Sequence, residues 1–121
     1  MRILGIDPGY AIVGFGVLDY EKGRFSPAQY GAITTRAHTR FEERLLEIYT
    51  DMTQLLGQAQ PQAVAMESLF YQHNQTTAMA VAEARGVLLL CARQAGVPVF
   101  EYTPMQVKQA VTGYGKAGKK Q

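Results

Sequence analysis

The stretch RILGIDPGYAIVGFGVLDY, residues 2–20, contains the pattern that decides the fold. Residues 2–7 form a short apolar run that ends at Asp7 and is followed at once by Pro8 and Gly9, which is typical of a buried strand closed by a turn. Residues 12–20 alternate glycine with bulky side chains and predict a second strand, at a place where another backbone comes close. Two strands joined by a tight turn therefore open the domain.

The next segment completes an antiparallel meander. Residues 21–23 predict a turn, and residues 25–35 predict a third strand. Pro27 places the beginning of this strand at a sheet edge, because proline cannot donate a ladder hydrogen bond.

The hydrophobic period then changes from strand-like to helical. Apolar residues recur at steps of three and four, which predicts an amphipathic helix; they are Phe41, Leu45, Ile48, Met52 and Leu55. Thr39 and Glu42 have capping-box spacing, with Glu42 able to reach back to the cap. Gly57 stands where a glycine would end the helix.

Two more strands and a long helix follow. Residues 63–67 predict a buried strand that ends, like the first, at an acid, Glu67. A helix is expected over residues 77–95, stopped by Gly96, and a fifth strand over residues 97–102. Because each of the last two strands is reached through a helix, each should lie parallel to its sheet neighbour.

The predicted class is α/β, with a mixed five-stranded sheet, three antiparallel strands and then two parallel ones, flanked by helices. No repeat or boundary divides residues 1–121, so we expect a single domain.

Composition limits the setting and the partners. The chain is 47% hydrophobic and has one cysteine, Cys91, inside an apolar run, where it should be a small core residue. No signal-peptide pattern and no apolar run of membrane-spanning length occur, so we expect a soluble, cytoplasmic protein. Residues 102–121 contain four lysines and no acid. Such a segment suits an anionic partner, although a solvated tail has the same composition.

Asp7 and Glu67 are the residues most informative about chemistry. Each ends an apolar strand, and ligands gather beyond the carboxyl ends of parallel strands. Two acids on neighbouring strands would repel each other, and a divalent cation would relieve the repulsion; oxygen ligands favour Mg²⁺ or Mn²⁺. Alternatively, each acid caps a turn, since Asp before Pro-Gly is common in ordinary turns.

Six blocks of sequence resemble the RuvC family of Holliday-junction resolvases, in the family's order. They are Gly5-Ile-Asp-Pro-Gly9, Gly14-Phe-Gly16, Ala65-Met-Glu-Ser-Leu-Phe70, Ala84-Arg-Gly86, Val99-Phe-Glu-Tyr102 and Gln106-Val-Lys-Gln109. The first block also resembles ATPases of the actin/hexokinase type and YqgF-like nucleases. The Glu-x-x-Phe and Gln-Val-Lys-Gln blocks make the match specific.

The resemblance implies a ribonuclease-H-like fold and a Mg²⁺-dependent endonuclease, with Mn²⁺ as a substitute, that resolves four-way junctions by paired symmetric nicks in DNA recombination and repair. Asp7 and Glu67 match the first two acids of the family's catalytic, metal-binding quartet. The product would carry 5′-phosphate and 3′-hydroxyl ends.

Other residues match DNA contacts. Phe70 matches an aromatic residue used against bases at the junction, and Lys108 and Lys119 match lysines near the scissile phosphate. Further DNA contacts are expected from Gln72, Asn74 and Lys116.

The resemblance also implies a homodimer and contacts with the branch-migration proteins RuvA and RuvB. Ala78, Ala82 and Gly86 form a small-residue stripe on the second helix, which another helix could approach closely, although the stripe could equally pack on the sheet. We expect part of the dimer contact there.

One departure from the family pattern concerns the remaining two acids. Family members carry them on a further helix, and Glu101 is the last acid in this chain. We therefore expect a truncated domain that lacks the final helix, with weak or absent cleavage. Non-cleaving recognition of branched DNA is the competing function.

Overall fold

The computed structural model describes residues 1–68 and 75–102. Its elements, in chain order, are β1 (Arg2–Asp7), β2 (Ile12–Glu21), β3 (Arg24–Thr34), α1 (Phe41–Ala59), β4 (Ala63–Glu67), α2 (Gln75–Gln94) and β5 (Val99–Tyr102). This is the order predicted from the hydrophobic pattern. In these two ranges, no helix has the length and apolar character needed to cross a membrane.

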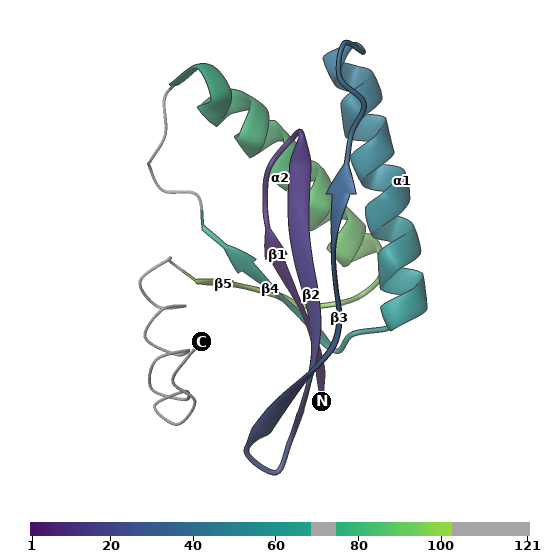
Figure 1. The fold of residues 1–121 in the computed structure, drawn as a ribbon, viewed down its shortest axis with the longest axis vertical. Coiled ribbons are helices and arrows are strands. Elements are labelled where there is room, and N and C mark those ends of the chain that lie inside the picture. Colours follow the sequence, from purple (N-terminus) through teal and green to yellow (C-terminus); the bar gives the residue numbers. More distant parts are fainter. Residues whose placement is uncertain (69–74, 103–121) are drawn as a thin grey trace.

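The strands form one five-stranded sheet in the order β3-β2-β1-β4-β5 (Figure 1). β1 and β3 are antiparallel to β2, whereas β4 is parallel to both β1 and β5. The predicted meander with two parallel strands is therefore confirmed. β3 lies at the sheet edge, and Pro27 pairs with Leu18 next to a register shift, as expected for a proline in a strand.

Both described helices cover the same face of the sheet, with α1 and α2 packed side by side (Figure 1). Alternate residues of the central strands point into this layer and are fully buried or nearly so; they include Leu4, Ile6, Val64 and Met66. The helices contribute Ile48, Met52 and Leu88, and Cys91 is a buried core residue as predicted. The residues between the buried strand positions consequently point to the opposite face.

The predicted boundaries of α1 are wrong at both ends. Its N-cap is Arg40, which makes no side-chain cap hydrogen bond, and the hydroxyl of Thr39 donates instead to the carbonyl oxygen of Arg36 at 2.9 Å. The helix continues through Gly57 to its C-cap Gln60, which adopts φ 48° and donates its N–H to the Leu56 carbonyl oxygen. A left-handed glutamine replaces the expected glycine, because the backbone hydrogen bond is available to any residue that tolerates this conformation.

Candidate active site

Asp7 and Glu67 lie at the same level on adjacent parallel strands. β1 and β4 pair in the register Ile6 with Met66, so the next residue of each strand is an acid. Ile6 and Met66 are buried under the helices. By strand alternation, Asp7 and Glu67 both point to the other face, at the carboxyl ends of their strands.

The two carboxyl groups interact. Partial burial raises the pKa of Glu67, and the negative charge of Asp7 together with a hydrogen bond to Asp7 raises the pKa further. Asp7 is exposed and Glu67 is half-buried, so the pair is open to solvent and to a ligand. The two acids therefore lie close together in the structure, as expected from their places at the ends of neighbouring strands.

The neighbouring strand leaves room for the pair. Gly14 of β2 pairs with Asp7, and a Cβ at Gly14 would lie 3.7 Å from the Asp7 Cβ. A Cβ at Gly16 would lie 3.3 Å from the ring of Tyr30. The alternating glycines of β2 thus accommodate side chains on the Asp7 face, rather than an approaching backbone as the sequence suggested.

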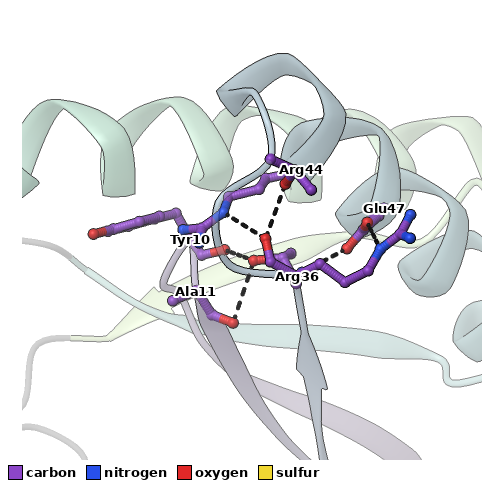
Figure 2. A network of polar contacts seen from close by, with 7 residues as sticks. Tyr10, Ala11, Arg36, Arg44 and Glu47 are labelled. Atoms are coloured by element: carbon purple, nitrogen blue, oxygen red, sulfur yellow. Dashed lines mark hydrogen bonds and ion pairs between the residues drawn. The ribbon is translucent and has the colours of Figure 1, made fainter.

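The turn after Asp7 is held by Thr35, the residue that follows β3. The backbone N–H of Thr35 donates to the carbonyl oxygen of Ala11 at 3.0 Å, and the Thr35 hydroxyl donates to the carbonyl oxygen of Tyr10 at 2.9 Å. The two acceptor residues, Tyr10 and Ala11, are labelled in Figure 2. Gly9 is required here because a Cβ would lie 2.2 Å from the carbonyl oxygen of Ile12. Asp7 is therefore followed by a tight turn with fixed ends.

The chain after Glu67 is held from β5. The backbone N–H of Ser68 donates to the carbonyl oxygen of Tyr102 at 2.7 Å, and its hydroxyl donates to the same oxygen at 3.2 Å. Both acids are thus positioned by the sheet and by the first residues beyond it.

Glu101 does not join the acidic pair. It pairs in register with Met66, which points toward the helices, and its carboxylate forms an ion pair with Arg85 of α2. Nothing in the sequence pattern singled out Arg85 as its partner. Glu101 therefore does not supply either of the two remaining acids of the quartet.

The pair suits a divalent cation. The charge of Asp7 raises the pKa of Glu67, and a bound cation would relieve this repulsion; Mg²⁺ is commonly held by one or two carboxylates, with waters and substrate phosphates as the other ligands. Within residues 1–68 and 75–102, no group of three or more His, Cys, Asp or Glu side chains forms a fuller cage. The residues present fit a cation that is also bound by its substrate.

The remaining predicted contacts lie outside the described residues; they are Phe70, Gln72, Asn74, Lys108, Lys116 and Lys119. On α2, Ala78, Ala82 and Gly86 are exposed. The stripe thus faces away from the core and does not pack on the sheet.

Comparison with solved structures identifies the class of protein. The yeast mitochondrial Holliday junction resolvase Ydc2 matches 97% of this chain with a TM-score of 0.66 at 12% identity. The match covers 57% of Ydc2 and shows a shared fold. Thermus thermophilus RuvC, solved in complex with a Holliday junction substrate, matches 98% of this chain at 36% identity and a TM-score of 0.86, over 73% of that chain. The fold is that of the ribonuclease-H-like junction resolvases.

The particular family follows from sequence. The family model described as crossover junction endodeoxyribonuclease RuvC matches residues 3–121. A protein of that name from Brevibacillus brevis is 58% identical over all 121 residues, which span 73% of its length, and one from Desulfitobacterium hafniense is 52% identical over the same share. The chain belongs to the RuvC family.

Proposed function

We propose that this chain is a structure-selective endonuclease that resolves Holliday junctions by paired symmetric nicks in DNA recombination and repair, with Asp7 and Glu67 as its catalytic, metal-binding carboxylates. The observation that carries the proposal is the placement of these acids side by side at the carboxyl edge of β1 and β4, where the charge of Asp7 raises the pKa of Glu67. Membership of an endodeoxyribonuclease family supports the reaction.

The cofactor proposed is Mg²⁺, with Mn²⁺ as a substitute, since both are held by oxygen ligands. When bound, the metal supplies Lewis-acid stabilisation of phosphate charge and makes an attacking water more acidic. The chain's own residues provide the anionic site: Asp7 and Glu67 point to the same face of the sheet from neighbouring strand positions, and Gly14 leaves space beside Asp7.

DNA binding is proposed for one aromatic side chain and for several lysines and amides that follow Glu67 in the sequence. Phe70 follows Glu67 closely, where an aromatic ring could stack on an unpaired base and contribute about 1–3 kcal/mol. Lys108 and Lys119 would neutralise backbone phosphates, with further contacts from Gln72, Asn74 and Lys116.

A homodimer fits the substrate, because a four-way junction has near two-fold symmetry and two sites related by a two-fold axis cut opposite strands. The exposed stripe of Ala78, Ala82 and Gly86 supports a helix contact between the two copies. The branch-migration proteins RuvA and RuvB remain the proposed partners, and a cytoplasmic location is proposed for this chain.

The 121 residues contribute two carboxylates to the site, and Glu101 is engaged by Arg85. We expect Asp7 and Glu67 to be required for cutting the junction. The experiment is a cleavage assay on a synthetic four-way junction with Mg²⁺, run beside the Brevibacillus brevis relative.

Mg²⁺-dependent nicking that disappears in Asp7→Asn and in Glu67→Gln supports the proposal. Nicking that survives both substitutions would refute the assignment of the site. Recognition without any cleavage is less favoured, since the relatives are named endodeoxyribonucleases, and a junction that shifts in Ca²⁺ yet stays intact in Mg²⁺ and in Mn²⁺ would favour it.

A further inference from the structure

The end of the sheet at which β1 stops, here called the rim, carries Asp7 and also an arginine side chain, that of Arg44, whose position is fixed. Arg44, in the first turn of α1, is half-buried, and its Nε donates to the carbonyl oxygen of Arg36 at 3.1 Å. Its guanidinium carbon lies 5.4 Å from the centre of the Tyr10 ring, and Figure 2 shows this arginine above the turn that contains Tyr10 and Ala11. A hydrogen bond at one edge and an aromatic ring against one face restrict the rotamers of the guanidinium.

The neighbouring arginines are already neutralised by acids. Arg36 pairs with Glu47 at 3.0 Å, and Arg40 pairs with Glu42 at 2.9 Å. Over residues 1–68 and 75–102, Arg44 forms no ion pair within 4 Å, although its charge helps to lower the pKa of Glu47 through space. Of its guanidinium nitrogens, only Nε donates to a protein acceptor in those ranges, so the two terminal amino groups are open to a ligand.

The distance from Arg44 to the acidic pair and the shape of the guanidinium indicate which ligand could bind there. Tyr10 is three residues beyond Asp7, so their Cα atoms are at most about 11 Å apart. With the Tyr10 side chain and the 5.4 Å from its ring to the guanidinium added, Arg44 lies within roughly 20 Å of Asp7, which corresponds to about six nucleotides at 3.4 Å of rise each. A planar guanidinium with two free amino groups suits bidentate binding of a phosphate.

We propose that Arg44 binds a backbone phosphate of the junction, within about six nucleotides of the phosphate held at Asp7 and Glu67. The proposal rests on the proposed function, because it assumes that DNA enters at this rim. Arg44 then adds affinity and fixes the register of the strand without reading a base. Tyr10 and the Arg36 carbonyl hold the guanidinium in the orientation that it needs before DNA arrives.

The test is the salt dependence of junction binding in Ca²⁺, compared between the wild-type chain, Arg44→Gln and Arg93→Gln. Arg93 is an exposed arginine in the last turn of α2. Its substitution therefore removes the same charge far from the rim. Loss of one phosphate contact should reduce the slope of log K against log salt by about 0.9 in magnitude. We expect this change, with about fivefold to tenfold weaker binding, for Arg44→Gln alone.

Two further variants separate binding from folding. Arg44→Lys keeps the charge and should keep the slope, and Arg44→Met, which keeps the contact with Tyr10, replaces the glutamine variant if the latter does not fold. A neutral variant that binds with the wild-type slope, even with a lowered melting temperature, overturns the role of Arg44. A wild-type chain that binds no junction overturns the proposed function, and the role of Arg44 with it.

Discussion

Asp7 and Glu67 follow the Ile6–Met66 pair of two adjacent parallel strands, and their carboxyl groups are close enough that the charge of Asp7 raises the pKa of Glu67. Such an arrangement costs stability, because like charges repel and Glu67 is half-buried. The sheet holds both acids in place through its register, and a cation bound between them would offset the repulsion. Function and stability therefore oppose each other at this edge.

Removal of one charge should stabilise the metal-free protein. Glu67→Gln keeps the shape of the side chain and ends the repulsion with Asp7. We expect the melting temperature without metal to rise by roughly 2–6 °C, while the increase that Mg²⁺ produces in the wild-type chain is lost. Differential scanning fluorimetry with and without Mg²⁺ measures both. A metal-free melting temperature at or below that of the wild type would contradict the proposed repulsion.

Removal of Glu101 alone from its ion pair with Arg85 should cost more stability than replacement of both partners. The Arg85 side chain is 18% exposed and that of Glu101 is 51% exposed, and the Nε of Arg85 is buried without a hydrogen-bond partner among the described residues. Glu101→Leu leaves a buried guanidinium unpaired and should destabilise the fold by about 1–3 kcal/mol. The double variant Arg85→Met with Glu101→Leu should recover most of this loss.

Urea denaturation of the two single variants and the double variant checks the coupling between them. Equal losses for both single variants that simply add in the double variant would show that the pair is not coupled.

The turn after Asp7 should not tolerate a side chain. Gly9→Ala places a Cβ 2.2 Å from the carbonyl oxygen of Ile12, so the backbone must shift. We expect a loss of more than about 1 kcal/mol in the free energy of unfolding. Gly57→Ala is the control, since it lies within α1 with open space around it and should stabilise by about 0.5–1 kcal/mol. Denaturant unfolding compares them, and a neutral Gly9→Ala would show that the turn rearranges freely.

The exposed small-residue stripe of α2 should contribute to self-association. Ala82→Arg places a long charged side chain where a second helix would approach, and we expect at least about tenfold weaker dimerisation. Thr50→Arg, at an exposed position of α1, is the control. Sedimentation velocity over a range of concentrations gives the dimer constant. An unchanged constant for Ala82→Arg would place the interface elsewhere.

The pattern of apolar residues was sufficient to predict the sheet, because buried strands and amphipathic helices each impose a period on the sequence. The ends of α1 could not be predicted in the same way. Arg40 and Gln60 cap this helix through backbone geometry, which leaves no residue-type signal. Thr39 has the right spacing for a capping box but donates to Arg36 instead.

The candidate site was predicted in part. Asp7 and Glu67 stand out because an acid that ends an apolar strand is unusual. Arg44 gave no such signal, since an arginine on a helix is ordinary until the fold brings it over Tyr10. The exclusion of Glu101 from the acidic pair likewise depends on strand register, which a single sequence does not specify for strands joined through a helix.

We propose that Asp7 and Glu67 together hold a divalent cation. Electron paramagnetic resonance of Mn²⁺ counts free and bound ion directly, and it needs neither DNA nor cleavage. We predict that the wild-type chain binds Mn²⁺, that Mg²⁺ competes for the same site, and that Asp7→Asn and Glu67→Gln each weaken binding by at least about tenfold. Binding of Mn²⁺ by both variants with wild-type affinity would contradict the claim.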